Sequence, residues 1–202
     1  MSTLQQDAGV GTTSTVADHI RGGLVASAPA RKALAVLRIG FGLTFLWAFF
    51  DKLLALGFST GAVTNAAGAK TGIDFFSKDA WIHDGNPTLG FLKFGASGPF
   101  EGLYNSIAGE AWVNWAFMLG LLFIGVTLTF GIAIRLGAAV GVVMYLMMWS
   151  VALLPANNPL IDDHILGAVS MAVLGLTLAG DTWGFGKVWS QHHLVASRPV
   201  LR

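Results

Sequence analysis

The segment 112–134 contains no charged residue and is almost entirely apolar. It is longer than the ~20 residues that a helix needs to cross a bilayer. Further apolar stretches run over residues 33–57, 136–154 and 163–180. Only 11% of the residues are charged, whereas a soluble domain usually has about 25%. We therefore predict an all-α membrane protein, a four-transmembrane-helix bundle with a long extracytoplasmic loop between helices 1 and 2.

Composition divides the chain into three predicted parts. Residues 1–30 are rich in Ser, Thr, Gly and Ala, which predicts a disordered cytoplasmic tail. Residues 31–189 form the predicted four-helix membrane domain, and residues 190–202 a second cytoplasmic tail. Cys is absent, which excludes disulfides and Cys-ligated iron–sulfur sites. The net charge of +1 gives no indication of a nucleic-acid partner.

Basic residues decide the orientation of such a bundle, because cytoplasmic segments of membrane proteins carry an excess of Lys and Arg. In a four-span arrangement, one side receives Arg21, Arg31, Lys32, Arg38, Arg135, Lys187, Arg198 and Arg202. The other side receives Lys52, Lys70, Lys78 and Lys93. We therefore predict a multi-pass protein of the cell membrane with both termini in the cytoplasm. The loop 58–109 and the stretch 157–164 then face outside.

Polar residues gather at the outer ends of all four predicted spans. They are Asp51, Lys52, Glu110, Asn114, Asn157, Asn158, Asp162, Asp163 and His164, and the loop adds His83 and Asp84. Ionisable groups at membrane depth are rare and often functional. This pattern predicts an outward-facing pocket for a small polar or redox-active ligand. The alternative interpretation is interfacial anchoring, with Asp162 or Asp163 as a helix cap.

Within this pocket we expect Lys52 to attract an anion and His164, beside carboxylates, to pass protons. The predicted catalytic residues are His164, Asp163 and Asp51, and the predicted substrate-binding residues are Lys52, Asn158, Asp162, His83 and Glu110. A metal site through His83, His164 and a carboxylate has no supporting ligand spacing, so we predict no metal.

Three further expectations concern packing. Arg38 and Asp181 lie at the inner side, where we expect them to pair. The connection between segments 112–134 and 136–154 is minimal, which predicts a tight antiparallel pair, and Gly137 with Gly141 supplies a small-residue face for close helix packing. The cluster Met144, Tyr145, Met147, Met148 and Trp149 suits either apolar packing, which we favour, or a quinone cleft.

Several motifs follow one another in a recognisable order. They are LRIG at 37–40, DKL at 51–53, GNPTLGFL at 85–92, the run from Gly125 through Gly131 to Arg135, NPLIDDHI at 158–165 and AGDTWG at 179–184. Together, over residues 33–189, they resemble the DoxX/DoxD-like family of membrane proteins. The resemblance implies a four-helix membrane bundle.

The best-defined activity of that family belongs to the large subunit of a thiosulfate:quinone oxidoreductase, which joins two thiosulfates to tetrathionate and reduces quinone. Other members are linked to membrane assemblies with superoxide dismutase and a sulfurtransferase. The resemblance therefore implies a quinone-linked oxidoreductase subunit acting on a small sulfur anion such as thiosulfate, with quinone as the electron acceptor. The expected partners are the lipid bilayer, a second small subunit or a membrane oxidoreductase complex, and further copies of the chain.

Two other functions compete with this expectation. The first is a non-catalytic membrane scaffold of a respiratory or antioxidant oxidoreductase complex. The second is a small-solute transporter, but the paired repeats and broken helices typical of such transporters are not visible in the sequence. An enzyme is expected to lose activity and keep its fold when Lys52 or His164 is truncated, whereas a scaffold is expected to tolerate an emptied pocket.

Overall fold

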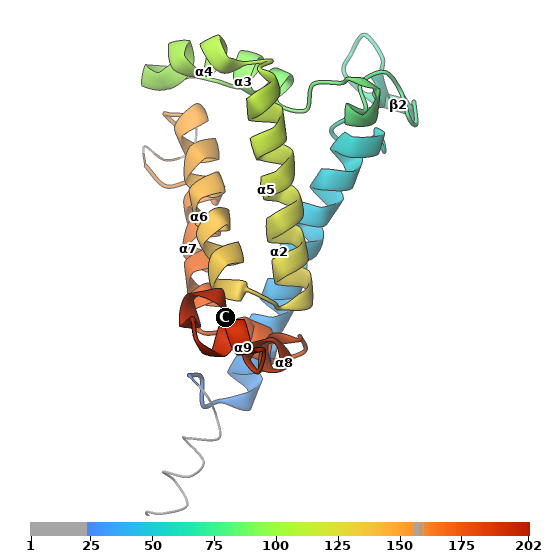
Figure 1. Cartoon of the computed structure of the whole chain (residues 1–202). Coiled ribbons are helices and arrows are strands. Elements are labelled where there is room, and N and C mark those ends of the chain that lie inside the picture. Colours follow the sequence, from blue (N-terminus) through green and yellow to red (C-terminus); the bar gives the residue numbers. More distant parts are fainter. Residues whose placement is uncertain (1–23, 156–157, 159) are drawn as a thin grey trace, which may run out of the picture.

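The computed structural model describes residues 24–155, 158 and 160–202 and is mostly helical (Figure 1). Residues 1–23 of the expected tail, and Asn157 and Pro159 of the polar stretch, lie outside the described residues. Three helices are long and apolar enough to cross a membrane, namely α2 (Ala28–Leu54), α5 (Ala111–Phe130) and α6 (Ile134–Val151). This is the pattern of a multi-pass membrane protein.

The fourth apolar segment forms a shorter helix than the sequence predicted. Helix α7 (Asp163–Leu176) has 14 residues, or about 21 Å at ~1.5 Å per residue, whereas the hydrocarbon core is ~30 Å thick. We expected this helix to reach Gly180. Leu178 instead adopts a left-handed backbone (φ 50°), which ends the helix, and the chain continues as the 3-10 turn η3 (Ala179–Asp181).

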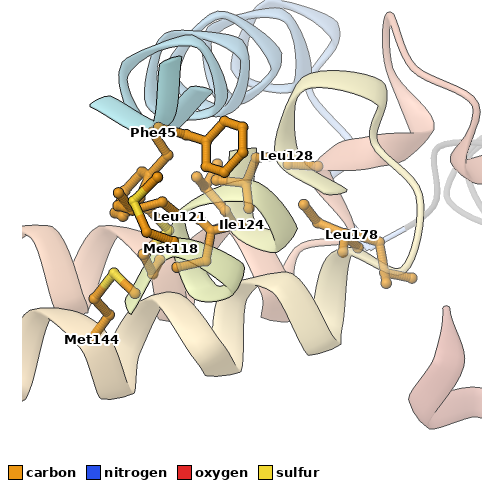
Figure 2. Close-up of a cluster of buried hydrophobic side chains, with 12 residues drawn as sticks. Phe45, Met118, Leu121, Ile124, Leu128, Met144 and Leu178 are labelled. Atoms are coloured by element: carbon orange, nitrogen blue, oxygen red, sulfur yellow. The ribbon is translucent and has the colours of Figure 1, made fainter. Parts of the chain in front are cut away.

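The long helices pack as two antiparallel pairs, α2 with α5 and α6 with α7 (Figure 1). A shared apolar core joins the pairs (Figure 2). The labelled core side chains are Phe45 of α2, Met118, Leu121, Ile124 and Leu128 of α5, Met144 of α6, and Leu178. Burying apolar side chains of this size and packing them closely stabilises a helix bundle in either water or lipid.

Glycines permit the close approach within each pair. A Cβ at Gly125 of α5 would lie 2.9 Å from the backbone nitrogen of Leu46 in α2, and one at Gly141 of α6 would lie 3.0 Å from Sδ of Met171 in α7. Gly137 faces Thr127 of α5, near the α5–α6 connection. The expected tight pairing of α5 with α6 therefore holds only near their connection. Gly141 packs against α7 instead. Toward the other end of the two helices, a cavity separates α5 from α6.

The segment between α2 and α5 folds across one end of the bundle, and we call residues 58–110 the cap (Figure 1). Its elements are the antiparallel strands β1 (Ala62–Thr64) and β2 (Lys70–Ile73), then η1 (Trp81–His83), α3 (Leu89–Phe94), η2 (Gly98–Phe100) and α4 (Glu101–Ile107). The Thr88 hydroxyl donates to Oδ1 of Asn114 in α5 (2.6 Å), and the backbone N–H of Ser97 donates to the Val151 carbonyl of α6 (2.9 Å). The cap is therefore fastened to helices of both pairs.

The opposite end of the bundle is closed by the C-terminal residues. After α8 (Gly186–Ser190) the expected tail 190–202 forms α9 (His193–Ala196) and η4 (Pro199–Leu201). The backbone N–H of Arg135 donates to the carbonyl of Arg202 (3.0 Å), and the Arg202 guanidinium pairs with Asp181 (2.8 Å). The expected pair of Arg38 with Asp181 is therefore wrong. Arg38 instead donates to backbone carbonyls, including those that the end of α5 leaves without helical partners.

Candidate functional site

A cavity of about 940 Å³ lies between α5 and α6 beneath the cap. Its walls are mostly apolar and include Val113, Ala116, Phe117 and Gly120 of α5 and Val140, Val143, Met144, Met147, Met148 and Val151 of α6. Polar groups form the smaller part of the lining. Lys52 of α2 and His164 of α7 reach it, and the cap contributes Ser59, Thr60, Asp79, Asn86, Thr88 and Tyr104. An apolar cavity of this size with a few polar groups is typical of a site for a small organic ligand.

A short hydrogen-bonded chain holds the ammonium group of Lys52. Its Nζ donates to the Ser59 hydroxyl (2.8 Å), which in turn donates to Oδ2 of Asp51 (2.6 Å). In the part of the chain that the structure describes, Lys52 is the only Lys or Arg that lines the cavity. The site therefore offers a ligand the positive charge of Lys52, while Asp79 of the cap adds a carboxyl group to the same lining.

His164 is oriented by Asp162, the N-cap residue of α7. Oδ1 of Asp162 accepts hydrogen bonds from the backbone N–H groups of His164 (3.0 Å) and Ile165 (3.1 Å). Its Oδ2 lies 2.6 Å from Nδ1 of His164. Because an ionised carboxylate only accepts, Nδ1 carries a proton, and in the uncharged form of the ring Nε2 is a proton acceptor. The pair has the arrangement of a histidine base oriented by a carboxylate.

The same contacts change the acidity of Asp162. Burial alone would raise the pKa of this carboxyl group, but hydrogen bonds from the His164 ring and from the Ile165 and His164 backbone, together with the charge of His164, hold the pKa below its ordinary value. A carboxyl group with a lowered pKa stabilises the folded state above its unfolded pKa of about 3.9. That stabilisation is lost as the pH falls through the folded pKa.

For Asp162→Asn we expect the free energy of unfolding at pH 7 to fall by about 1 kcal/mol, because the capping acceptor of α7 is weakened. The difference from the wild type is expected to shrink as the pH falls below about 4, because Asp162 is protonated first in the unfolded state and then, at the lowered pKa, in the folded state. Helical circular dichroism during unfolding between pH 7 and pH 3 measures this difference. The exposed Asp84→Asn is the control. A difference that stays constant down to pH 3 contradicts the capping role.

The structure brings two of the predicted site residues, Lys52 and His164, to one cavity, and Asp162 acts there through His164. Asp51 does not line the cavity. It is only 1% exposed, and its two oxygens accept from the backbone N–H groups of Phe58, Ser59 and Thr60. The negative charge of Asp51 thus organises the start of the cap and, through Ser59, the position of Lys52.

The other four predicted residues, Asp163, Asn158, His83 and Glu110, are exposed and lie outside the cavity lining. Asn158 forms a local turn by accepting from the backbone N–H groups of Leu160 and Ile161 (both 3.0 Å). Within residues 24–155, 158 and 160–202, no three His, Asp or Glu side chains gather in a way that could hold a metal.

Most of the lining residues were not predicted from the sequence. Thr88 belongs to the motif at 85–92, but neither it nor Tyr104 was assigned to the site, because their places depend on how the cap folds. The cluster of methionines, in contrast, was noticed in the sequence. Met144, Met147 and Met148 all line the cavity. Met144 also belongs to the buried core, and Tyr145 and Met148 pack against it, so the favoured prediction of apolar packing holds for these three, while the quinone cleft stays a prediction. Flexible, polarisable methionine side chains suit a surface that adapts to a ligand.

Comparisons of the chain with known protein families, with curated proteins and with solved structures gave no match. The resemblance to the DoxX/DoxD-like family therefore stays a prediction from the sequence motifs. The cavity, its fixed ammonium group and its oriented imidazole are the features on which a function has to rest.

Proposed function

We propose that this chain is a membrane oxidoreductase subunit that binds a quinone in the cavity between α5 and α6. In this proposal it passes electrons to the quinone from a small sulfur anion such as thiosulfate. The observation that carries the proposal is the combination of mostly apolar walls with polar groups that include Lys52 and His164 in one cavity. A quinone ring needs this combination, because its faces are apolar and its carbonyl oxygens accept hydrogen bonds.

In the proposed placement all four helices cross the membrane, and α7 together with η3 forms the fourth span. Both chain ends and the C-terminal turns face the cytoplasm, and the cap is extracytoplasmic. The distribution of basic residues supports this orientation, since Arg31, Lys32, Arg135, Lys187, Arg198 and Arg202 all lie on the side away from the cap. The cavity then opens near the outer membrane surface, where a sulfur anion arrives from water.

The residues of the cavity supply the functions that the reaction needs. Two thiosulfate ions each give up one electron and join through a new S–S bond, and a bound quinone supplies the sink for these two electrons and for two protons. Lys52 attracts the anion through its fixed positive charge. His164, held in one tautomer by Asp162, moves protons at Nε2. A second subunit or a membrane oxidoreductase complex is the proposed partner.

The test is thiosulfate-dependent reduction of a menaquinone analogue by the detergent-purified chain, alone and with co-purified partners. We expect Lys52→Ala and His164→Ala each to lower turnover at least about tenfold, or about 1.4 kcal/mol of transition-state stabilisation. The matched controls are Lys93→Ala and His193→Ala, since both residues are exposed and outside the cavity lining. These controls are expected to keep wild-type turnover, and all four variants to keep the wild-type melting temperature.

Absence of turnover by the wild-type chain, even with its partners present, would sink the thiosulfate assignment. The scaffold function would then be favoured. Loss of partners after substitution of exposed cap residues outside the cavity lining, such as Phe75, which is 57% exposed, would support that scaffold directly.

A further inference from the structure

The end of the bundle opposite the cap is closed by residues 183–202, which we call the base (Figure 1). The base is fastened where one apolar helix ends and the next begins. The backbone N–H of Phe185 donates to the carbonyl of Phe130, the last residue of α5 (2.8 Å), and the centroids of the two rings lie 6.4 Å apart. At the start of α6, the Arg135 guanidinium donates to the carbonyl of Pro199 (2.9 Å). In a bilayer the base therefore lies at the depth where acyl chains and headgroups meet.

The base exposes large apolar side chains although its backbone is well anchored. The indole N–H of Trp189 donates to the carbonyl of Leu201 (2.7 Å), and Val195 is buried. Five other apolar side chains of the base are nonetheless between 58% and 67% exposed: Trp183, Phe185, Val188, Leu194 and Val200. Exposed apolar side chains on an ordered surface indicate contact with a membrane or a partner. Aromatic residues at the ends of membrane spans commonly lie at headgroup level.

The charges at this end of the bundle are almost all positive. Apart from the buried Arg38, the part of the chain that the structure describes places six basic residues there: Arg31, Lys32, Arg135, Lys187, Arg198 and Arg202. Among the same described residues, Asp181 is the only acidic side chain at this end, and it pairs with Arg202 (2.8 Å). Lys187 and Arg198 are exposed and form no ion pair with a described residue. The base thus presents unpaired cations close to exposed apolar side chains.

We propose that the base binds anionic phospholipids of the surrounding bilayer. Lys187 and Arg198 bind headgroup phosphates, and the neighbouring Val188 and Leu194 lie among the first carbons of the acyl chains. A zwitterionic lipid would leave the positive charge of the base without a counter-charge, and a free phosphate ester would leave the apolar side chains without a partner. The depth of the base favours lipid over a soluble acidic protein, because acyl chains already surround the ends of α5 and α6. This proposal does not involve the cavity or its ligand, and it requires only that the bundle lies in a bilayer.

The test measures lipid binding to the detergent-purified full chain by native mass spectrometry. The probes are phosphatidylglycerol and phosphatidylcholine with the same oleoyl chains, so that only the headgroup differs. We expect the Kd for phosphatidylglycerol to be at least about tenfold lower than the Kd for phosphatidylcholine. Glycerophosphoglycerol, which is the anionic headgroup without acyl chains, is expected not to compete at equal concentration, since it cannot use the apolar side chains.

Two double variants separate the charged from the apolar part of the base. Lys187→Ala combined with Arg198→Ala is expected to lower the preference for phosphatidylglycerol at least about fivefold. Val188→Ser combined with Leu194→Ser is expected to weaken both lipids alike, by at least about threefold. The matched control is Lys78→Ala combined with Lys93→Ala, two exposed cations of the cap, and it is expected to keep the wild-type preference. All of these side chains are exposed, so the melting temperature is expected to stay at the wild-type value.

Three results would overturn the proposal. Equal Kd values of the wild type for the two lipids would favour a soluble acidic protein as the partner of the base. An unchanged preference after loss of Lys187 and Arg198, or the same loss in the cap control, would place the lipid contacts elsewhere. Competition by glycerophosphoglycerol would indicate a site for free phosphate esters. None of these results affects the function proposed for the cavity, which is tested by its own variants.

Discussion

Replacement of Arg38 by alanine is expected to lower the free energy of unfolding by about 3 kcal/mol, because the guanidinium makes charged hydrogen bonds that alanine cannot replace. Arg38 is completely buried. Its Nη1 donates to the carbonyls of Leu128 and Thr129, the latter at 3.0 Å, and its Nη2 donates to the carbonyl of Trp183 (2.9 Å). One side chain of α2 therefore joins the end of α5 to the turn that follows α7.

The physical reason for this large effect lies at the C-terminus of α5. The last carbonyls of a helix have no helical partners and carry the negative end of its dipole. Helix α5 ends at Phe130, so Leu128 and Thr129 are such carbonyls, and Arg38 caps them with a positive charge. Alanine would leave these carbonyls unpaired in the interior and would open a space where the guanidinium was. Both changes destabilise the folded state.

Thermal unfolding of the detergent-purified chain measures the effect, and for a chain of this size the expected fall in melting temperature is roughly 10 °C. The melting temperature of Arg38→Lys is expected to lie between those of the wild type and Arg38→Ala. An ammonium group keeps the charge but cannot match the planar fork of the guanidinium. Lys32→Ala is the control, because Lys32 is exposed on the same helix. A melting temperature within about 2 °C of the wild type for Arg38→Ala would show that the hydrogen bonds from Arg38 to the end of α5 contribute little to stability.

The apolar pattern of the sequence predicted the helices well, because spanning length and low charge leave a chain few other folds. Segments 112–134 and 136–154 differ from α5 and α6 by only a few residues at each end. Segment 163–180 was predicted too long, since no pattern of hydropathy reveals that Leu178 turns left-handed. The pairing of α5 with α6 was predicted from their short connection. In the structure, close helix packing depends more on the contacts of Gly125 with α2 and of Gly141 with α7.

Only part of the candidate site could be predicted from the sequence. Whether a residue could be placed depended on whether its partners in the structure are side chains or backbone groups. Lys52 and His164 were placed together by topology alone, because the last turn of α2 and the first turn of α7 lie at the same end of the bundle. Arg38 was assigned the wrong partner, and Asp51 was predicted to be catalytic, whereas in the structure each binds backbone groups. Every residue carries such groups, so the side-chain pattern of a sequence cannot point to them. The lining residues that the cap contributes, such as Thr88 and Tyr104, could not be predicted, since their positions depend on the fold of the cap.

Replacement of Asp51 by asparagine is expected to lower the free energy of unfolding by about 3 kcal/mol, as two or more buried N–H donors lose their acceptor. Oδ1 of Asp51 accepts from the Phe58 N–H (2.9 Å), and Oδ2 accepts from the Ser59 N–H (2.9 Å) and the Thr60 N–H (3.1 Å). Asparagine has only one acceptor oxygen, and its NH₂ group would point at donors. The start of the cap would therefore lose its anchor to α2.

This substitution also separates a structural role of Asp51 from the catalytic role predicted from the sequence. Because Ser59 connects Asp51 to Lys52, loosening the cap is expected to lower affinity for thiosulfate together with the melting temperature. Ser59→Ala, which cuts only that connection, is expected to raise the KM for thiosulfate with a smaller loss of stability. Asp74→Asn, at an exposed carboxylate of the cap, is the control. Full stability of Asp51→Asn with abolished turnover would instead establish Asp51 as a participant in the reaction.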